Sequence, residues 1–374
     1  MRVALVHDWL TGLRGGERVL DELAGLFPGS HLYTLVHVPG ATTARIESLP
    51  ITASPLSRLP GVARHYRALL PLLPWAVGRL RLRDYDLVLS TSHAFAKGVR
   101  PPPGATHVSY CFTPMRWVWD QRDAYLGRGL RRALSWPLAA ALRRWDRRTS
   151  RPDRVHRFLA ISRTVAERIR AHWGRSARVI HPPVDAVRFA PSGRPPGDYY
   201  LLVGAFVAYK REDVAVEAFR RLGRPLVVAG DGPGRAALAA RAPANVRFLG
   251  RVPDAVLADL YAGCRALVYP QEEDFGLVPL EAQASGRPVV ALARGGATET
   301  VVPLGDPAGR APTGILFERQ TAEALADAVA RFEAAAGEFD PGAVRRHAEE
   351  FAAPRFRREL LEAVQEALAG GPVV

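Results

Sequence analysis

Short apolar runs alternate with amphipathic, helix-like stretches along this whole chain, and this alternation limits its fold more than any other feature of the sequence. In the first half, strands are expected at 2–7, 31–36, 86–91, 105–112, 157–161 and near 177–181. In the second half, they are expected at 199–204, 225–230, 246–249, 265–270 and 288–291, with a short one at 313–316. Strands that alternate with helices join into parallel sheets, so the sequence predicts an α/β fold.

A proline- and glycine-rich segment from Pro182 to Gly197 divides the chain near its middle, and we interpret it as the connection between two Rossmann-like domains. Open parallel sheets bind ligands at the carboxyl ends of their strands, so we expect the two domains to face each other across a cleft. The C-terminal helices are expected to pack back toward the first domain. The predicted parts are an N-terminal domain at 1–185, a linker at 186–198, a second domain at 199–340 and C-terminal helices at 341–374.

The composition excludes several other kinds of protein. No apolar run is long enough for a transmembrane helix, and the start from Met1 to His7 is too short and strand-like for a signal peptide. Cys111 and Cys264 are the only cysteines, so the sequence has neither a disulfide framework nor the ligand spacing of a metal site. It also lacks the phosphate loop of nucleoside triphosphatases and the serine elbow of hydrolases. These observations predict a protein of the reducing cytoplasm.

Positive charge is concentrated in the first half of the chain. Residues 1–190 contain 30 arginines and lysines against 13 acidic residues, whereas residues 191–374 contain 21 against 24. Such a bias suggests an anionic partner, and a membrane surface, a lipid phosphate or a nucleic acid would each fit. Nucleic acid is the least expected of the three, because no recognised nucleic-acid-binding module is present. An arginine-rich, solvated surface without a partner is the alternative.

Two segments of the basic half, at 61–82 and 128–148, combine arginine with tryptophan and leucine. Such segments can bind at a lipid interface, which would make the protein peripheral at the inner face of the plasma membrane. Alternatively, the leucines pack into the domain core and the arginines face water. The prolines within 61–82 should interrupt any long helix there. The sequence leaves both interpretations open.

Two glutamates, Glu273 and Glu281, flank the expected start of a helix. The apolar run 265–270 is typical of a buried strand, while Pro279 suits the first turn of the following helix and Gly286 suits its C-terminal cap. Glu273 is then expected in a loop beside the helix N-terminus, and Glu281 in the first helical turn. Carboxylates beside free backbone N–H groups can hold sugar hydroxyls and a diphosphate together, which predicts a nucleotide-sugar site.

Two other helix starts carry residues suited to a phosphate. Lys210 and Arg211 follow the strand expected at 199–204, where positive charge opposes the helix dipole, so a bound diphosphate explains them better than chance surface charges do. Gly15 and Gly16 follow the first strand, and their lack of side chains lets a phosphate or sugar approach the backbone. A tight turn without a ligand is the alternative for the glycine pair.

The ordered set of motifs in the second half resembles the retaining glycosyltransferases of family 4, which adopt the GT-B fold, over nearly all of residues 199–317. The matching pieces are Tyr209-Lys-Arg211, Gly230-Asp-Gly232, Phe248-Leu-Gly-Arg-Val252, the pair Glu273 and Glu281, and Gly295-Gly296. The first half is similar to one branch, the mannosyltransferase-like enzymes of bacterial O-antigen and exopolysaccharide assembly. That similarity rests on His7-Asp-Trp-Leu10, Arg14-Gly-Gly-Glu17, His93-Ala-Phe-Ala-Lys-Gly-Val99, Tyr110-Cys-Phe-Thr-Pro-Met-Arg116 with Trp119-Asp120, and His181-Pro-Pro-Val-Asp185.

The resemblance implies a role for each matching residue. Lys210, with Arg211 nearby, would neutralise the donor diphosphate and so assist departure of the nucleoside diphosphate. Glu281 would accept hydrogen bonds from the ribose hydroxyls, and Glu273 would hold the transferred sugar. The other implied donor contacts are the backbone of Phe275, Gly276 and Leu277 for the sugar, Gly15 and Gly16 for the diphosphate and sugar, and Arg251 and Val252 for the base.

The same resemblance implies a catalytic set of Glu273, Lys210 and His93, with acceptor contacts from Arg116 and Lys97. The family works without a metal and retains the anomeric configuration. The implied reaction transfers a sugar, mannose from GDP-mannose in this branch, to a glycan or a polyprenyl-diphosphate-linked acceptor in cell-surface polysaccharide synthesis.

Two positions depart from the family pattern. Ala205 stands where family members often carry a phosphate-binding arginine, and Phe112 where this branch often has histidine. Phenylalanine can neither donate a hydrogen bond to a sugar nor accept a proton, so His93 or Arg116 would have to supply the polar contact. These departures keep two alternatives open: a nucleotide-sugar-binding protein without turnover, and a sugar-nucleotide epimerase of similar fold.

Overall fold

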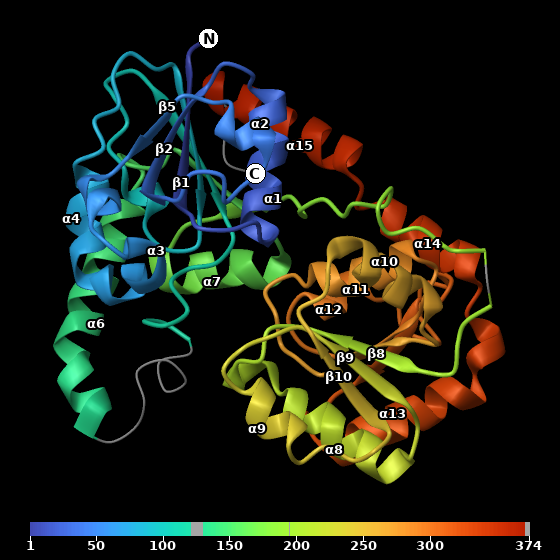
Figure 1. Ribbon diagram of the computed structural model, residues 1–374. Helices are drawn as coiled ribbons and strands as arrows, with labels where there is room; N and C mark the ends of the chain where they lie inside the picture. The colour runs from blue at the N-terminus through green and yellow to red at the C-terminus, as the bar shows by residue number, and fades with distance from the viewer. Residues whose placement is uncertain (121–129, 194, 371–374) are drawn as a thin grey trace. The chain divides into compact units, whose positions relative to one another are not determined.

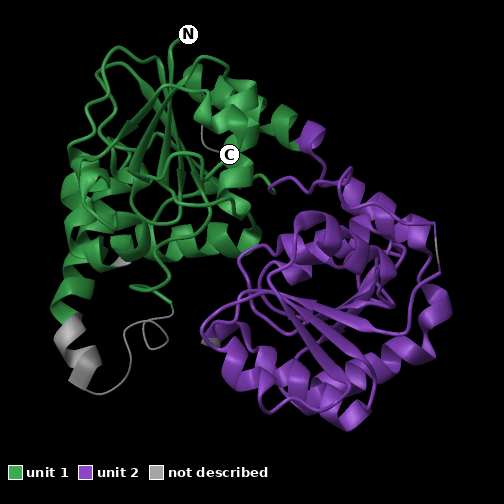
Figure 2. Ribbon diagram, in the orientation of Figure 1, with its two compact units in different colours: residues 1–181, 356–374 green, residues 182–355 purple. Residues whose placement is uncertain are grey.

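The computed structural model describes residues 1–120, 130–193 and 195–370. The chain divides into two compact units, which are coloured separately in Figure 2. The first unit comprises residues 1–181 together with 356–374, and the second comprises residues 182–355. The segment predicted as a linker, 186–198, lies in the second unit, and the last helix returns the chain to the first.

Within the described residues, the first unit is built on a seven-stranded sheet whose neighbouring strands are all parallel. The strands are β1 (Val3–Leu10), β2 (His31–His37), β3 (Ile51–Ala53), β4 (Leu87–Ser92), β5 (Thr106–Cys111), β6 (Arg157–Ala160) and β7 (Ala177–Val179). They lie in the order β3-β2-β1-β4-β5-β6-β7. Every strand expected from this half of the sequence is present. The edge strand β3 was not expected, because it is too short to form a clear apolar run.

The main helices of the first unit begin and end at residues that suit those positions. The side chain of Glu17 caps the first turn of α1 (Gly15–Leu26). Helix α7 (Arg163–Trp173) starts at the capping hydroxyl of Ser162 and ends at Gly174 in the left-handed conformation. The other helical segments are α2 (Ala44–Glu47), η1 (Pro55–Arg58), α3 (Val62–His65), η2 (Tyr66–Leu72), α4 (Leu73–Gly78), η3 (Ala96–Gly98) and α6 (Leu130–Thr149) (Figure 1).

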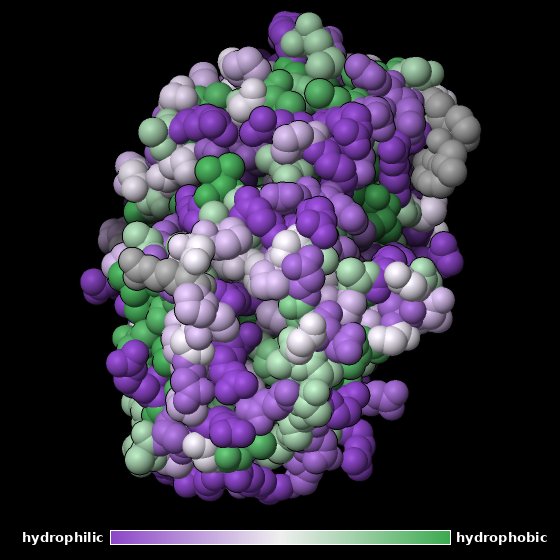
Figure 3. Space-filling model, turned by 90° about the vertical axis from the view of Figure 1, so that its right-hand side faces the viewer, coloured by the Kyte–Doolittle hydropathy of each residue, from purple (hydrophilic) through white to green (hydrophobic). Residues whose placement is uncertain are grey.

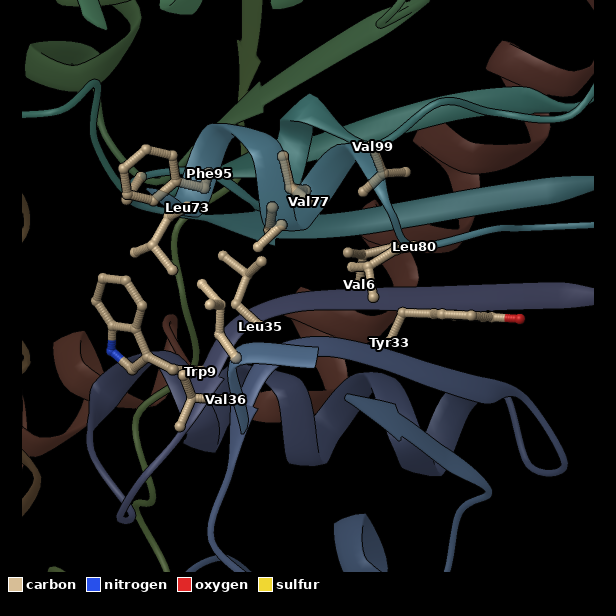
Figure 4. Packing of buried hydrophobic residues seen from close by; sticks show 14 of the residues in the cluster. Val6, Trp9, Tyr33, Leu35, Val36, Leu73, Val77, Leu80, Phe95 and Val99 are labelled. Atoms are coloured by element: carbon tan, nitrogen blue, oxygen red, sulfur yellow. The ribbon is translucent and has the colours of Figure 1, made fainter. Parts of the chain in front are cut away.

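The segment 61–82 contributes to the core on one face of this sheet (Figure 4). It forms three short pieces, α3, η2 and α4, with Pro71 inside η2 and Pro74 in the first turn of α4, so no long helix forms, as predicted. Leu73 and Val77 of α4 belong to the same buried cluster as side chains of β1 and β2. This burial favours the structural interpretation of the segment, although Leu72 and Trp75 are each 48% exposed.

Within the described residues, the second unit holds a six-stranded sheet that is also parallel throughout. Its strands are β8 (Tyr200–Val203), β9 (Leu226–Ala229), β10 (Val246–Gly250), β11 (Leu267–Tyr269), β12 (Val289–Leu292) and β13 (Gly314–Phe317). They lie in the order β10-β9-β8-β11-β12-β13, and each corresponds to a strand expected from the sequence. The strand order reverses direction between β8 and β11, and open α/β sheets bind ligands at such a switch point.

Helices flank the second sheet, and α8 and α13 pack against each other. The helical segments are η4 (Ala208–Lys210), α8 (Glu212–Leu222), α9 (Arg235–Ala239), α10 (Asp254–Gly263), α11 (Leu277–Ala284), α12 (Ala297–Thr300), α13 (Ala322–Ala334), η5 (Ala336–Glu338) and α14 (Pro341–Glu349). Two parallel sheets with flanking helices confirm the predicted α/β class with two Rossmann-like domains.

The last helix, α15 (Ala353–Leu368), begins in the second unit and packs on the first from Phe356 onward. The ring of Phe356 meets that of Tyr110 edge-on, with 5.7 Å between centroids. Near its end, the carboxylate of Glu366 accepts a hydrogen bond from Arg157 at 3.0 Å. Helix α14, by contrast, packs on α11 of the second unit.

The surface and the helices carry two further observations. None of the described helices is long and apolar enough to cross a membrane. On the face shown in Figure 3, hydrophilic residues predominate and hydrophobic ones occur in small groups. Cys111 and Cys264 are both buried.

Candidate functional site

In the second unit, the loops after β8 and β11 bring Lys210 and Glu273 together. The Nζ atom of Lys210 lies 2.9 Å from Oε1 of Glu273, and the two side chains are 18% and 20% exposed. Both loops leave the carboxyl ends of neighbouring strands at the switch point of the sheet, where ligands bind in such folds. Two residues predicted to be catalytic therefore form an accessible ion pair.

Arg211 shares this loop but has a different partner. It adopts left-handed backbone angles (φ 56°) at the start of α8, and its guanidinium donates two hydrogen bonds of 3.0 Å to the carboxylate of Asp213. Hydrogen bonding to Asp213 raises the pKa of Arg211. Its predicted contact with the diphosphate stays a prediction.

Glycines shape the loop that carries Glu273. A Cβ atom on Gly295 would lie 2.2 Å from the carbonyl oxygen of Glu273, and one on Gly296 would lie 2.1 Å from that of Phe275. The backbone N–H of Gly296 donates to the carbonyl of Glu273 at 2.9 Å. The backbone of residues 273–276 can lie this close to the loop after β12 only because these two positions carry no side chain.

Helix α11 begins at Leu277, directly after Gly276 in the left-handed conformation (φ 82°). The N–H groups of its first turn have no partners within the helix, which suits sugar or phosphate oxygens. The sequence predicted Glu281 in the first turn of this helix. It lies in the second turn, because the helix starts two residues before Pro279. The hydroxyl of Tyr261 donates to Glu281 at 2.8 Å and so orients its carboxylate.

Two buried polar side chains outside the predicted set, Glu212 and Gln271, lie beside this ion pair. They are 6% and 3% exposed, and Oε1 of each lacks a hydrogen-bond partner among the described residues. A Cβ atom on Gly204, at the end of β8, would lie 3.5 Å from Oε1 of Gln271 and 3.6 Å from Oε1 of Glu212. Burial raises the pKa of Glu212 to about 7, against the charge of Lys210. The only sequence signal for it was a glutamate directly after the Lys210-Arg211 pair.

The residues predicted to meet the base lie at the same edge of the sheet. Arg251 and Val252 directly follow β10, with Arg251 exposed and Val252 partly buried. Ala205, which replaces the family's arginine, is exposed on the loop after β8. A Cβ atom on Gly230 would lie 1.8 Å from the carbonyl oxygen of Gly204, so the loops after β8 and β9 also touch through their backbones.

In the first unit, the buried carboxylate of Asp8 organises the loop after β4. Its two oxygens accept the backbone N–H groups of four consecutive residues, 93–96, at 2.6–3.0 Å. Nδ1 of His93 also lies 3.1 Å from Oδ2 of Asp8, and the side chain of His93 is 34% exposed. Burial lowers the pKa of His93, although the charge of Asp8 opposes this. Donation from Nδ1 to Asp8 leaves Nε2 of the neutral ring as an acceptor for a ligand.

A second buried polar pair, His7 and Glu17, lies beside the glycine turn of this unit. Nδ1 of His7 lies 2.7 Å from Oγ1 of Thr91, and Nε2 lies 3.9 Å from Oε1 of Glu17. Burial raises the pKa of Glu17, but hydrogen bonding and the charge of His7 outweigh this and bring the pKa below its usual value. A Cβ atom on Gly16 would lie 3.3 Å from the Phe112 ring and 3.6 Å from the His7 ring. This close packing accounts for the glycine whether or not a ligand binds.

The other predicted residues of the first unit differ in their access to solvent. Gly15 is exposed at the first position of α1. Arg116 is only 8% exposed. Burial raises the pKa of Asp120, but hydrogen bonding to His172 and the charges of His172, Arg168 and Arg116 outweigh this and lower it. Lys97 is 1% exposed, and its Nζ lies 2.8 Å from Oδ1 of Asp146. An ammonium enclosed in this way cannot contact an acceptor, so we correct that prediction and assign Lys97 a role inside the unit.

Within each unit, predicted residues therefore gather at one edge of the sheet. Lys210, Glu273 and Glu281 do so in the second unit, and Gly16 and His93 in the first. Among the described residues, no group of three or more histidine, cysteine, aspartate or glutamate side chains is arranged to hold a metal ion. The chemistry offered by the second unit is that of a cation, carboxylates and free N–H groups.

Two family descriptions match this chain. "Glycosyltransferase Family 4" matches residues 13–188, and "Glycosyl transferases group 1" matches residues 187–340. The two matches meet between the halves of the chain and together span most of its length.

Three curated relatives match shorter stretches. D-rhamnosyltransferase WbpZ of Pseudomonas aeruginosa is 34% identical over 126 residues, which is 29% of this chain and 33% of the relative. O-antigen chain mannosyltransferase C of Escherichia coli is 32% identical over 125 residues, 31% of this chain and 34% of the relative. The GDP-mannose-dependent alpha-mannosyltransferase of Mycolicibacterium smegmatis is 33% identical over 169 residues, 40% of this chain and 43% of the relative. The chain thus spans less than half of the length of these relatives.

Two solved structures share the fold at low sequence identity. The Anabaena protein Alr3699/HepE, in complex with UDP, aligns with a TM-score of 0.70 at 16% identity, over 98% of this chain and 100% of that one. Sucrose-phosphate synthase of Thermosynechococcus elongatus aligns with a TM-score of 0.73 at 18% identity, over 99% and 100%. With two parallel-sheet units and both family matches, this chain belongs to the family 4 glycosyltransferases of the GT-B fold.

Proposed function

We propose that this protein is a retaining glycosyltransferase, which moves a sugar from a nucleotide-sugar donor to an acceptor in the synthesis of a cell-surface polysaccharide. The observation that carries the proposal is the accessible Lys210–Glu273 ion pair at the switch point of the second sheet. The free N–H groups of α11 and the carboxylate of Glu281 lie on the element that follows. A cation for the diphosphate, N–H groups for oxygens and carboxylates for hydroxyls are the groups that a nucleotide sugar requires.

In the proposed reaction, the bond between the anomeric carbon and the diphosphate breaks, the acceptor oxygen bonds to that carbon, and the acceptor's proton passes to the departing diphosphate, on which negative charge grows. Lys210 stabilises that charge, and because Glu273 already holds its side chain at the sheet edge, little reorganisation is needed. Once the diphosphate binds Lys210 in place of Glu273, the carboxylate of Glu273 can accept hydrogen bonds from the transferred sugar. Glu281, oriented by Tyr261, accepts those of the ribose. Lys210 and the start of α11 supply the positive charge, so the proposal includes no metal.

The donor that we propose is GDP-mannose, and the acceptor a glycan or a polyprenyl-diphosphate-linked glycan. The support comes from relatives named for mannosyl transfer, one of them GDP-mannose-dependent. A solved structure of this fold holds UDP, so uridine donors belong in the same test. On the first unit, Nε2 of His93 is the group we propose to contact the reacting sugars, with Arg116 on the acceptor side. We place the reaction in the cytoplasm, with the protein peripheral at the inner face of the membrane.

Donor binding and turnover with a panel of GDP-, UDP- and dTDP-sugars test the proposal. Calorimetry should show that one donor binds, and Glu281→Ala should weaken that binding about tenfold or more, because hydrogen bonds to charged groups contribute about 1.5–3 kcal/mol. Glu217→Ala, on the half-exposed surface of α8, is the matched control and should bind donor normally. If no donor binds, or if Glu281→Ala behaves like the control, the proposal fails. NMR of the product's anomeric configuration checks retention.

A nucleotide-sugar-binding protein without turnover is the second candidate, and Phe112 favours it. Its ring packs against Gly16 and His7, where the related branch often carries histidine, and it offers neither donor nor acceptor. Calorimetric binding of a donor without transfer or hydrolysis would support this candidate, and measurable turnover would exclude it. A sugar-nucleotide epimerase would instead convert the donor in the absence of any acceptor, which NMR of donor and protein alone would detect.

A further inference from the structure

A hollow lined by arginines lies on the first unit, where α6 and α7 pack against each other (Figure 1). Its volume is about 730 Å³. We call it the arginine hollow, and its charged lining consists of Arg144, Arg147, Arg148, Arg151, Arg170 and His172. None of these residues belongs to the candidate functional site.

Most of these guanidinium groups lack a counter-charge. Among the described residues, no carboxylate lies within ion-pair distance of Arg144, Arg148 or Arg170. Arg151 pairs with Asp153 at 3.3 Å, and both of these side chains are about two-thirds exposed, so this pair contributes little. The hollow therefore carries a surplus of positive charge at the surface.

The acidic residues nearby do not remove this surplus. Asp146 of α6 is buried and forms an ion pair with Lys97 at 2.8 Å. Asp120 binds His172 at 2.9 Å, and Arg168 lies 3.7 Å from it. Several guanidinium groups around one hollow repel each other, so an anion placed among them would be attracted by all of them.

Helix dipoles explain only part of this arrangement. Cations are favoured at the C-terminal end of a helix, and Arg147, Arg148 and Arg170 lie in the last turns of α6 and α7. Arg144 lies more than one turn before the end of α6, and Arg151 lies beyond it. The hollow therefore contains more arginines than the two helix dipoles account for, which indicates a surface that binds an anion.

A second hollow, of about 440 Å³, continues along α6 toward its N-terminal half. It shares Arg144 and Arg147 with the first, and Trp136 lines it with 60% of its surface exposed. Trp136, Ala140, Arg144 and Arg147 line this hollow, and their spacing of three or four residues places them on one face of the helix, with Arg148 at its edge. From Trp136 to Arg147 this face is about 17 Å long. It presents an aromatic end and a cationic end.

We propose that this face of α6, from Trp136 to the arginine hollow, is a docking surface for an anionic lipid bilayer, with lipid phosphates in the hollow and Trp136 among the headgroups. Arginine forms charge-assisted hydrogen bonds with phosphates, and tryptophan favours the membrane–water interface. Proteins that bind single strands of nucleic acid expose stacking aromatics beside the cations along the groove. Here Trp173 lines the arginine hollow, but its ring packs on Phe158 and its N–H donates to the buried Asp146, so the exposed aromatic is Trp136 at the other end. The inference does not rest on the proposed sugar transfer, because it uses none of the same residues.

Flotation of the full-length protein with lipid vesicles tests this proposal. We expect binding to phosphatidylcholine vesicles that contain about one-third phosphatidylglycerol, and none to pure phosphatidylcholine. Arg144→Gln combined with Arg148→Gln should weaken this binding roughly 30-fold, because each basic residue near an anionic surface contributes about a fivefold factor. Arg247→Gln with Arg319→Gln removes the same charge from exposed positions of the second unit and should change binding by at most about twofold.

A further variant tests the aromatic end, since Trp136→Ala should weaken binding to the same vesicles several-fold without changing the charge. The proposal is overturned if pure phosphatidylcholine binds equally well, if both double variants lose binding to the same extent, or if the α6 double variant binds normally. Binding of single-stranded RNA or inorganic diphosphate at these arginines, without vesicle binding, would also overturn it. Thermal melting and donor binding should be unchanged in the α6 double variant. A wild-type protein that transfers no sugar would leave the flotation result intact, so the two proposals fail separately.

Discussion

The two units use their charged groups differently. In the second unit, Lys210 and Glu273 pair at an accessible edge of the sheet, each about one-fifth exposed. In the first unit, Asp8 is wholly buried, and both of its oxygens accept backbone N–H groups of the loop at 93–96. Charge in the second unit is therefore available to a ligand, whereas the charge of Asp8 builds the loop that presents His93.

The largest effect on activity is expected where charge faces a ligand. Lys210→Ala should lower kcat/KM for the donor about 10²–10³-fold, because it removes a preorganised group that stabilises the leaving diphosphate. The free energy of unfolding should change by less than about 1 kcal/mol, since a partly exposed ion pair contributes little to stability. Steady-state kinetics and urea unfolding measure the two quantities, with Arg220→Ala on α8 as the control. A variant with full activity would remove the distinction between the units.

Asp8→Ala should show the opposite pattern. Four backbone N–H groups would lose a buried, charged acceptor, which should cost about 3–5 kcal/mol of unfolding free energy and lower the yield of folded protein. Urea unfolding monitored by circular dichroism measures this loss. Asp153→Ala, at an exposed position of the same unit, should be close to wild type. Equal stability of the two variants would show that the charge of Asp8 does not hold the loop.

Glu212 sharpens the comparison, because it is a buried carboxyl beside the accessible Lys210–Glu273 pair. Burial raises its pKa to about 7 from the ordinary value of 4.5, so between these values the folded protein holds a proton that the unfolded chain has lost. The free energy of unfolding should therefore fall as the pH rises from about 4.5 to 7, by roughly 2–3 kcal/mol, and then level off.

Glu212→Gln should remove this decline, and urea unfolding between pH 5 and 8 measures it for the variant and the wild type. The ionised carboxylate also repels a diphosphate on the neighbouring Lys210, so the variant should bind donor with less dependence on pH. Glu217→Gln, a half-exposed glutamate on the same helix, should keep the wild-type pH profile. Parallel profiles for Glu212→Gln and the wild type would mean that its pKa is not raised.

A smaller loss of stability than in Asp8→Ala is expected from a change to the glycines that shape the loop carrying Glu273. Gly296→Ala places a methyl group where the structure has only 2.1 Å to the carbonyl oxygen of Phe275, so the loop must shift. We expect a loss of about 1–3 kcal/mol in stability, together with weaker donor binding. Gly337→Ala is the matched control, because its added Cβ would meet nothing within 4 Å. If calorimetry and unfolding show no difference between the two variants, the backbone contact does not define the loop.

The meeting of Lys210 and Glu273 was predictable because both residues occur in short local motifs. Lys210 follows one strand and Glu273 follows another, so the rule that ligands meet the carboxyl ends of parallel strands was enough to place them at one edge. The buried pair of Glu212 and Gln271 was not predictable, because the burial of each depends on a loop remote in the sequence. The start of α11 was also missed, since Pro279 suits any position of the first turn.

The first unit shows why the rest could not be predicted. Asp8 meets the loop at 93–96, and Lys97 meets Asp146, through contacts between residues far apart in the chain. No local pattern reveals such a pairing, so a lysine in a family-like motif was assigned to an acceptor although it lies inside the unit. The positions of the strands needed little more than buried apolar runs, and of the strands that the structure describes only β3 was too short to recognise.

The return of α15 to the first unit has a consequence for the order in which the protein folds. Residues 182–355 form an insertion within the first unit, so the chain passes between the units twice. During synthesis, Tyr110 cannot contact Phe356, and Arg157 cannot bind Glu366, until the whole second unit has been made. The second unit has its strands and helices available earlier. The half that begins the chain is therefore the last to be completed.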